Sequence, residues 1–476
     1  MALRTVKEYR DSLRDGRAVF FRGQRVADVT EHPVIAVAIQ HAALEYSMPQ
    51  DPRWRDLAVV EDGGEVYNRC YKIPLDGADL LRRSELIAAT TREGAAYPVL
   101  LKEIGTEAMF ALRMIGERLA ASGKPQYRQR VERYYRYCRD NDLALAVAQT
   151  DVKGDRALGP AAQEHPDYYV RVVAQRDGGI VVRGAKVHTS LVTNANELIV
   201  LPTRVMRPGD EAYAVSFALP VNAPGLKLIA SPHGSEPKNA IEHPISARRK
   251  MMETLTVFDD VFIPEDRIFL NGEVEFAGLL AITFVRFHRF TAVSYKLPLL
   301  ELLAGAGYAI AEANGISAAG HVRDKLTQLA AYHTIALGLL QRSAAACTIE
   351  HGVAVPNTLL VNVAKYHFAH NYHHAIQLVQ DLAGGLLVTA PAAEDLTAEA
   401  TREYTRKYLG GRKGTDAEER LRLMYLIADL TASDYGGYQE VLAVHAEGGF
   451  EAEKLQTQRE YNFADVAAYA RRLAGI

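Results

Sequence analysis

The chain has 476 residues and a net charge of −3 at pH 7, with 48% hydrophobic and 24% charged residues. This balance is typical of a soluble globular protein and gives no reason to expect nucleic acid or an anionic membrane as a partner. No apolar run approaches the roughly 20 residues of a membrane span, and the N-terminus lacks an apolar secretion segment, so we expect a cytoplasmic protein without a membrane partner.

Residues 1–145 are predicted to form an N-terminal helical domain. Apolar residues recur at helical spacing over 76–95 and 96–122, and Gly123-Lys-Pro125 ends the second of these helices. A further helix, rich in Arg and Tyr, is expected over 127–142. A short β segment is expected over 23–28.

Residues 146–275 are predicted to form a middle β domain, a barrel or sandwich of short strands. Gly, Pro and Asn turns separate alternating apolar runs. The expected strands cover 168–175, 180–190, 197–205, 212–221, 226–230 and 254–264.

Residues 276–476 are predicted to form a C-terminal four-helix bundle with a C-terminal extension. Ala, Leu and small residues dominate, as in tightly packed bundle helices. The expected helices cover 297–313, 318–350, 357–384, 401–409 and 416–431. The order of helices, strands and helices has neither the βαβ alternation nor the GxGxxG motif of a Rossmann cofactor site.

The three cysteines, Cys70, Cys138 and Cys347, lie far apart in the sequence. They form neither a CxxC pair nor an even set, so neither a disulfide framework nor a zinc ribbon is predicted. Three cysteines are also too few for a four-thiolate iron–sulfur cluster within one chain, although a mixed ligand set stays open.

A polar loop follows the apolar run that ends at Ala148. Gly154 permits a tight turn or a close backbone approach, and Arg156 could bind a phosphate or carboxylate through two hydrogen bonds. A strand that opens into such a loop is a common ligand-binding arrangement. From the residues alone, a solvated turn with a local Asp–Arg pair is the simpler interpretation.

Several strings along the whole chain resemble the 4-hydroxyphenylacetate 3-hydroxylase family. These are flavoproteins similar in fold to acyl-CoA dehydrogenases, and the family also contains 4-hydroxybutyryl-CoA dehydratase. The order and spacing of the strings carry the resemblance. The strings are Gln149–Arg156, Gly184–Ser190, Glu197–Thr203, Phe258–Pro264, His288-Arg289, Gly315–Lys325 and Gln380–Pro391.

The resemblance implies an α+β, acyl-CoA dehydrogenase-like fold that binds FAD between the β domain and the C-terminal helices. It also implies a homotetramer that is paired through the C-terminal bundle. The short hydroxyl side chains of Thr189 and Ser190 at a strand end could hydrogen-bond flavin ring edges, although from these residues alone an ordinary strand end is the simpler interpretation. For Gly436-Gly437 alone, a helix break is the simpler interpretation. The implied flavin contacts are Ala148, Gln149, Thr150, Lys153, Gly154, Asp155, Arg156, Thr189, Ser190, Tyr435, Gly436 and Gly437.

The chain departs from both branches of that family. The dehydratase branch holds a [4Fe–4S] cluster through three Cys and one His; His288 lies in the matching region, but Tyr295 stands where a Cys is expected. The paired cysteines are also missing from the matching stretch 99–103. The hydroxylases grip a phenol with an Arg, a Tyr and a His, and none of the three is retained at 104–108 or near Val147. We therefore expect FAD without an iron–sulfur cluster, and a different substrate.

Three residues are candidates for the chemistry. His288 could act as a general base or a hydrogen-bond donor, or it could be a satisfied core histidine. Arg286 could bind an acidic substrate or flavin phosphates, or it could be a surface charge on a helix. Lys296 could line the former cluster cavity together with Tyr295. In the histidine-rich stretch 366–374, an interface or solvated face is favoured over a metal site.

Two functions follow as hypotheses. The first is a two-component monooxygenase that receives reduced FAD from a separate reductase and uses O2 to hydroxylate a small substrate. The missing nicotinamide-binding motif is consistent with a separate reductase. The alternative is a cluster-free flavin-dependent dehydratase, isomerase or desaturase that acts on an acyl thioester.

Overall fold

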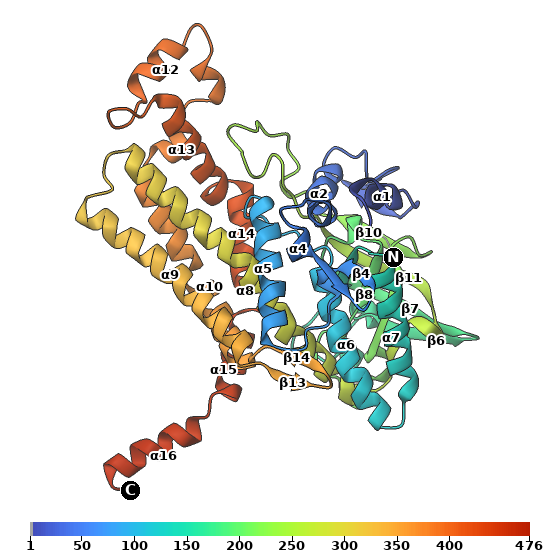
Figure 1. Cartoon of the computed structure of the whole chain (residues 1–476). Coiled ribbons are helices and arrows are strands. Elements are labelled where there is room, and N and C mark those ends of the chain that lie inside the picture. The colour runs from blue at the N-terminus through green and yellow to red at the C-terminus, as the bar shows by residue number, and fades with distance from the viewer. Residues whose placement is uncertain (1–2) are drawn as a thin grey trace. The chain divides into compact units, whose positions relative to one another are not determined.

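The computed structural model describes residues 3–476 (Figure 1). The chain divides into two compact units. The first unit comprises the chain up to Ala240, Pro244–His288 and Ile349–Ala354. The second comprises Ile241–His243, Arg289–Thr348 and Val355–Ile476. We call them the β-containing unit and the bundle unit; the predicted division into three domains stays a prediction.

The β-containing unit begins with helices whose ends carry local capping signals. The side chain of Asp76 accepts a hydrogen bond from the backbone N–H of Asp79, and Pro125 occupies the first turn of the last of these helices. The helices are α1 (Val6–Ser12), α2 (Ile35–Ala42), α3 (Leu44–Ser47), α4 (Arg55–Ala58), α5 (Gly77–Glu93), α6 (Glu103–Ala121) and α7 (Pro125–Asp140). A hairpin of β3 (Val59–Asp62) and β4 (Glu65–Asn68) lies between α4 and α5.

Helix α6 begins at Glu103, whereas the sequence predicted a helix from residue 96. The backbone of Ala95, Ala96 and Leu100 has φ between 58° and 60°, in the left-handed region. A right-handed helix cannot include such residues. The expected helix therefore starts one and a half to two turns later than its apolar spacing indicated.

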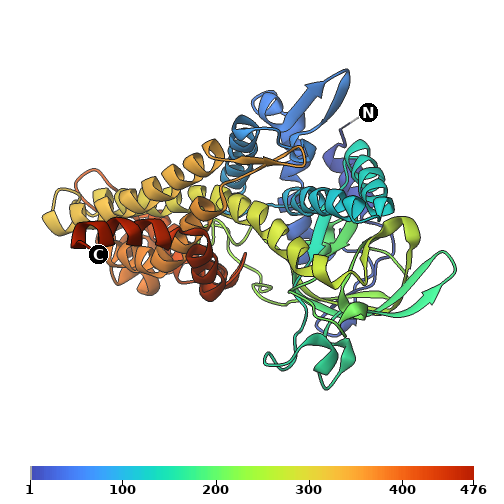
Figure 2. The same cartoon turned by 90° about the horizontal axis from the view of Figure 1, so that it is seen from below.

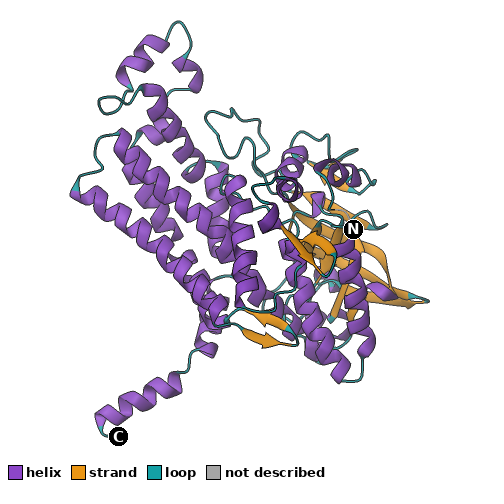
Figure 3. Cartoon of the chain, viewed as in Figure 1, coloured by secondary structure: helices purple, strands orange, loops and turns teal. Residues whose placement is uncertain are grey.

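Two sheets form the rest of this unit (Figure 3). A six-stranded sheet has the order β2-β1-β10-β11-β7-β6, and a four-stranded sheet has the order β12-β9-β8-β5. The strands are β1 (Val19–Phe21), β2 (Gln24–Arg25), β5 (Leu145–Ala148), β6 (Arg171–Arg176), β7 (Gly179–Ser190), β8 (Glu197–Val200), β9 (Val215–Pro220), β10 (Leu226–Ala230), β11 (Glu253–Pro264) and β12 (Ile268–Asn271). Every residue of β5 and β8 is buried, and the two strands pair in parallel.

The bundle unit is helical. Helix α9 packs along α10, as Figures 1 and 2 show. The helices are α8 (Val274–Ala313), which starts in the first unit, α9 (Gly320–Ala345), α10 (Thr358–Ala383), α11 (Leu386–Thr389), α12 (Arg402–Tyr408), α13 (Ala417–Thr431), α14 (Asp434–His445), α15 (Phe450–Glu460) and α16 (Phe463–Ala474). The α+β, acyl-CoA dehydrogenase-like fold class is confirmed.

Two predictions for this region were wrong in detail. Helix α8 runs through Pro298 and starts at Val274 rather than at 297, because buried apolar residues on both sides of the proline stabilise the helix by packing. The helix expected over 318–350 ends at Ala345. After it, β13 (Thr348–Glu350) and β14 (Val353–Val355) form a hairpin. Its turn residues His351 and Gly352 both have positive φ, as a tight hairpin turn requires.

By length and composition, α8 is the one helix among residues 3–476 that could cross a membrane. However, 72% of its most apolar window is buried inside the protein. Burial of this kind is typical of a core helix.

Candidate functional site

The loop after β5 is anchored by a buried ion pair. Lys186 of β7 lies 2.9 Å from the carboxylate of Asp151, and both side chains are at most 3% exposed. Lys186 also donates to the carbonyl oxygens of Gln149 and Leu201, each at 2.9 Å. Burial lowers the pKa of Lys186, and Asp151 counteracts this. The pair therefore fixes the backbone at the start of the predicted flavin loop.

Thr203 completes this anchor. Its hydroxyl donates to the carbonyl oxygen of Gln149 at 2.6 Å, and it also bonds the Asp151 carboxylate. The backbone N–H of Asp151 donates to the same hydroxyl at 2.8 Å. Three of the strings that carried the resemblance thus meet at one point, Gln149–Arg156, Gly184–Ser190 and Glu197–Thr203. The contacts of Asp151, Lys186 and Thr203 therefore explain why these three segments occur together, which no single residue indicated.

The turn at Lys153-Gly154 packs against Tyr168 and Gln163. Gly154 has φ 53°, and a Cβ there would lie 2.3 Å from a ring carbon of Tyr168. The amide of Gln163 holds the next residue, because it accepts from the N–H of Asp155 at 2.9 Å and donates to its carbonyl at 2.8 Å. Only glycine fits this position, so the loop has one defined path.

The basic side chains of the loop make no close ion pair. Neither Lys153 nor Arg156 lies within 4.0 Å of an acidic group among residues 3–476. Burial lowers the pKa of Lys153, the nearby charges of Arg156 and Arg204 lower it further, and the charge of Asp151 counteracts this. Arg204 donates to the carbonyl of Leu158 in the same loop at 3.3 Å. Positive charges that lie near one another without a close ion pair suit a phosphate group, so these residues fit the diphosphate of FAD.

The two hydroxyl residues at the end of β7 differ. The Thr189 hydroxyl is enclosed and makes no hydrogen bond within the described chain. The Ser190 hydroxyl donates to the carboxylate of Glu253 at 2.8 Å. A buried hydroxyl without a partner is costly unless something else bonds it. Thr189 therefore fits the edge of a bound flavin ring, whereas Ser190 already has a partner.

The third predicted flavin contact lies in the bundle unit. Gly436 and Gly437 belong to the first turn of α14 and do not break a helix, contrary to the simpler interpretation. A Cβ at Gly436 would lie 2.9 Å from the backbone of Thr431, so this glycine lets the start of α14 approach the end of α13. Tyr435 is 3% exposed. Packing alone explains the small residue at Gly436.

His288 contacts a buried carboxylate. Its Nδ1 lies 2.9 Å from Glu107 of α6, and the Glu107 side chain is 1% exposed. The imidazole stacks on Phe284 with ring centroids 5.1 Å apart. His288 is therefore a firmly oriented histidine, and sequence reasoning had missed its partner.

Arg286, two residues earlier, has its own acidic partner. Its guanidinium bonds both carboxylate oxygens of Glu350, at 3.2 and 2.6 Å. An acidic substrate would have to compete with this carboxylate. The geometry therefore gives Arg286 a structural contact at the β13–β14 hairpin.

Lys296 belongs to a buried acid–base group in the bundle unit. Its ammonium lies 2.8 Å from both the Tyr295 hydroxyl and the Glu447 carboxylate, and Tyr295 also hydrogen-bonds Glu447. Burial lowers the pKa of Lys296 to about 8, with Glu447 acting against this shift. Glu447 has φ 57°, a strained value for this residue type, and such strain clusters at functional sites.

The sequence contained one signal for Glu447, the Glu447-Gly448-Gly449 string. Gly448 has φ 100°, and a Cβ there would lie 2.8 Å from the guanidinium of Arg289. Nothing in the sequence pointed to Glu107, because a buried carboxylate looks like any other helical glutamate.

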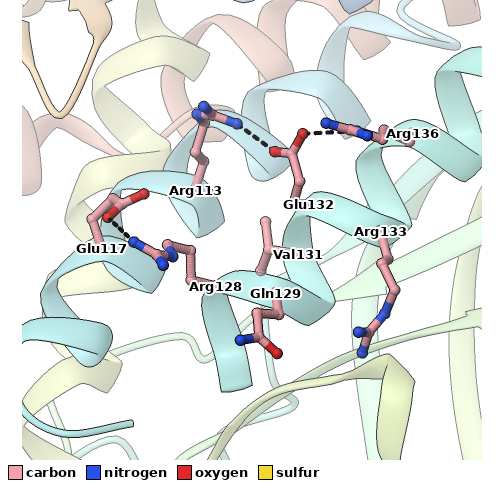
Figure 4. A pocket seen from close by; sticks show the side chains of 8 residues that line it. All are labelled: Arg113, Glu117, Arg128, Gln129, Val131, Glu132, Arg133 and Arg136. Atoms are coloured by element: carbon pink, nitrogen blue, oxygen red, sulfur yellow. Dashed lines mark hydrogen bonds and ion pairs between the residues drawn. The ribbon is translucent and has the colours of Figure 1, made fainter. Parts of the chain in front are cut away.

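The histidine-rich stretch and the α6–α7 surface lie outside this site. His374 contacts Gln328 at 3.0 Å, and no group of three metal-ligating side chains is found in residues 3–476. A surface pocket between α6 and α7 has paired charges, such as Glu117 with Arg128 at 3.3 Å (Figure 4). Its lining residues are Arg113, Glu117, Arg128, Gln129, Val131, Glu132, Arg133 and Arg136.

Comparison with known families identifies the family of the chain. Residues 5–270 match the model described as 4-hydroxyphenylacetate 3-hydroxylase N terminal, and residues 277–475 match the corresponding C-terminal model. The chain belongs to the 4-hydroxyphenylacetate 3-hydroxylase family. The predicted resemblance is thereby confirmed.

Members of both branches of the family are similar to the chain. A 4-hydroxybutyryl-CoA dehydratase/vinylacetyl-CoA-Δ-isomerase from Clostridium aminobutyricum is 31% identical, over 100% of each chain. The oxygenase component of a 4-hydroxyphenylacetate 3-monooxygenase from Thermus thermophilus is 30% identical, over 92% of this chain and 90% of the relative. A solved structure of such an oxygenase component, complexed with FAD, has a TM-score of 0.92 and 27% identity, over 99% and 98% of the two chains.

Proposed function

We propose that this family member is the oxygenase component of a two-component, flavin-dependent monooxygenase. It would use reduced FAD and O2 to hydroxylate a small molecule, an aromatic compound or a biosynthetic intermediate. The observation that carries this proposal is the anchored loop with two cations, Lys153 and Arg156, that make no ion pair within 4.0 Å among residues 3–476. The oxygenase-component relative and the FAD-bound structure support it.

The residues of the chain have separate roles in this proposal. Lys186 and Asp151 hold the loop, Lys153 and Arg156 bind the diphosphate, and Thr189 bonds the ring edge. Reduced FAD, when bound, supplies the two electrons that activate O2; one oxygen atom enters the substrate and the other leaves as water. The protein excludes water and orients the substrate, and His288 contacts it. A separate flavin reductase delivers the reduced FAD, and a cytoplasmic location stays a prediction.

Flavin binding and oxygen transfer test this proposal together. We expect the purified chain to bind FAD and, with reduced FAD and ¹⁸O2, to place one ¹⁸O atom into a member of a panel of small aromatic compounds and biosynthetic intermediates. The double substitution Lys153→Ala/Arg156→Ala should weaken FAD binding by about tenfold to a hundredfold, since two charge-assisted contacts are lost. The control Lys227→Ala removes an exposed lysine of the same unit that pairs with Asp259. Failure to bind FAD, or ¹⁸O-free product, would contradict the proposal.

The buried Lys296 favours a second candidate function. A cluster-free flavin-dependent dehydratase, isomerase or desaturase that acts on an acyl thioester needs a base that accepts a proton from the substrate, and its reaction does not use O2. Lys296, Tyr295 and Glu447 form such an acid–base group within 2.8 Å contacts. The relative from Clostridium aminobutyricum is a 4-hydroxybutyryl-CoA dehydratase/vinylacetyl-CoA-Δ-isomerase.

The pH dependence distinguishes the second candidate. Lys296 can accept a proton only as the neutral amine, and its pKa of about 8 means that this form increases as pH rises through 8. We expect anaerobic conversion of vinylacetyl-CoA, monitored by chromatography, to rise from pH 7 to 9 and level off above. Lys296→Met should remove the activity. Conversion that is independent of pH in this range, or that survives Lys296→Met, would rule out Lys296 as the base.

We also propose a homotetramer, paired through the bundle unit and its C-terminal extension. Helix α16 contains no buried residue, and its apolar side chains Phe463, Val466, Tyr469 and Leu473 are 46–70% exposed on one face. Such a face is typical of an interaction site. We expect light scattering to show four 52.5-kDa chains, and Tyr469→Ser/Leu473→Ser to reduce that number. Arg471→Ser, on the opposite face of α16, is the control and should leave the assembly intact.

A further inference from the structure

The loop between β10 and β11 carries a run of three cations, Arg248, Arg249 and Lys250. Residues 244–250 contain no acidic side chain, although the whole chain has a net charge of −3. Neither Arg248 nor Arg249 makes an ion pair within 4.0 Å in the described part of the chain. Neighbouring like charges repel each other, so two adjacent arginines without a close acid suit an anionic ligand.

Lys250 has a structural role in this loop. Its ammonium donates to the carbonyl oxygens of His233 and Gly234, at 2.5 and 3.0 Å. The carbonyl oxygen of Lys250 in turn accepts from Nδ1 of His41 at 3.1 Å. His41 is 1% exposed, and burial lowers its pKa to about 4, so the neutral ring adds no charge. Lys250 and His41 therefore fix the path of the backbone beside Arg249.

Arg249 is half-buried and keeps an edge of its guanidinium unused. One terminal nitrogen donates to the carbonyl oxygen of Glu93, the last residue of α5, at 3.0 Å. The side chain makes no other hydrogen bond to the residues that the structure describes. Burial lowers the pKa of Arg249, the charge of Arg248 lowers it further, and the charge of Glu93 counteracts this. The remaining N–H donors can bind a planar carboxylate through two hydrogen bonds.

The backbone next to this arginine is strained. Ala95 and Ala96, which follow the end of α5, have φ of 58° and 60°, in the left-handed region. The ring of Tyr97 then meets the ring of His41 edge to face, with centroids 5.3 Å apart. Positive φ at non-glycine residues persists only where the surrounding structure holds it, and it clusters at ligand-binding sites. The strained segment and His41 therefore give Arg249 a rigid support within the β-containing unit.

The start of β11 connects this loop to the end of β7. Thr254 pairs with Thr189, and the N–H of Leu191 donates to the carbonyl oxygen of Met252 at 2.9 Å. Arg249 precedes Met252 by three residues, and such a segment spans at most about 10 Å. Arg249 is therefore close to the strand end that carries Thr189, the hydroxyl residue that fits the edge of a flavin ring.

We infer that Arg249, with Arg248 beside it, binds the carboxylate of an aromatic acid. This inference rests on the proposed function, since it takes the flavin ring to lie at the end of β7. The carboxylate accepts two hydrogen bonds from the unused edge of the Arg249 guanidinium, and no covalent bond changes. The aromatic ring extends from there toward the flavin. The substrate class is therefore a small aromatic compound that carries a carboxylate.

Matched acids and amides test this site without turnover. The probes are benzoate, phenylacetate and 3-phenylpropanoate, each compared with its neutral amide by titration calorimetry of the full chain loaded with oxidised FAD. We expect at least one acid to bind about tenfold to a hundredfold more tightly than its amide, because only the carboxylate forms a charge-assisted pair. Arg249→Gln should remove this ratio, and Arg249→Lys, which keeps the charge without the planar fork, should restore part of it. Equal affinities within all three pairs would overturn the inference.

Arg176 supplies the matched control. It is an exposed arginine of β6 in the same unit, and it makes no ion pair within 4.0 Å with any described residue. Arg176→Gln should keep the wild-type ratio of acid to amide affinity. Modification by phenylglyoxal, followed by peptide mass spectrometry, is a second readout that needs no variant. The tightest acid should slow modification of Arg249 and leave that of Arg176 unchanged; an Arg249 rate that is the same with and without the acid would contradict the site.

Failure of the proposed function appears separately, because phenylglyoxal protection is measured with and without FAD. If no ¹⁸O enters any compound of the panel while an acid still protects Arg249, the monooxygenase proposal is wrong and the carboxylate site is upheld. If ¹⁸O enters neutral compounds as readily as acids, and Arg249→Gln changes neither rate, the monooxygenase proposal is upheld and the carboxylate site is wrong.

Discussion

Replacing Lys186 with methionine is expected to weaken FAD binding at least tenfold and to lower the free energy of unfolding by about 3–5 kcal/mol. The substitution leaves the Asp151 carboxylate buried without its cation and leaves the carbonyl oxygens of Gln149 and Leu201 without a donor. The loop that begins at Gln149 would then lose its fixed path. Fluorescence titration with FAD and urea unfolding measure the two effects.

Two variants are the controls for Lys186→Met: a double substitution that removes both charges of the ion pair, and the substitution of a surface lysine. Lys186→Met/Asp151→Asn should be less destabilised than Lys186→Met alone, because no unpaired charge stays buried. Lys227→Met removes an exposed lysine of β10 in the same sheet and should change neither measurement. If Lys186→Met binds FAD as tightly as the wild type does, the anchor does not position the loop.

Lys365→Met in the bundle unit is expected to lower the free energy of unfolding by about 3–5 kcal/mol at neutral pH. Lys365 is fully buried, lies 2.8 Å from Glu453 and 3.8 Å from Glu447, and donates to the carbonyl of Ala443. Burial raises the pKa of Glu453, and Lys365 is the main group that lowers it. Without Lys365, the pKa of Glu453 should rise further.

The sign of the pH dependence follows from this shift. If the pKa of a carboxyl group is higher in the folded than in the unfolded protein, the folded protein becomes less stable as the pH rises through the folded pKa. Lys365→Met should therefore lower the free energy of unfolding, relative to the wild type, by less at pH 5, where Glu453 can be protonated, than at pH 8. Urea unfolding at both pH values measures it. Lys454→Met removes an exposed, i,i+3 paired lysine on the same helix as Glu453 and should show no measurable deficit at either pH. A deficit for Lys365→Met that is constant with pH would contradict the burial argument.

The helices that local signals define were predictable from the sequence. Helix α5 begins at Gly77 behind its cap Asp76, close to the expected start, whereas α7 begins at Pro125, two residues before the start expected at 127. The start of α6 was not predictable in this way, because the positive φ values of Ala95, Ala96 and Leu100 have no glycine to signal them. The hairpin after α9 was missed because its strands have three residues each, too short for a periodic pattern.

Contacts between residues that lie far apart in the sequence could not be predicted from the sequence. His288 and Glu107 are 181 positions apart, and Tyr295 and Glu447 are 152 positions apart. No local periodicity connects residues at such separations. The flavin loop was predicted through the order of the family strings, but the reason for their order, the junction of Asp151, Lys186 and Thr203, is visible only in the folded chain.

The sequence by itself determined the fold class and the family, because these depend on local spacing and on ordered strings that survive in a linear comparison. The position of the flavin loop stays a prediction. Only the tertiary structure decided which charges are neutralised. It gave Arg286, Lys186 and His288 close acidic partners and left Lys153 and Arg156 without an ion pair within 4.0 Å among residues 3–476. The physical reason is that the energy of a charge depends on its burial and on the nearest opposite charge, and both are set by distances in space.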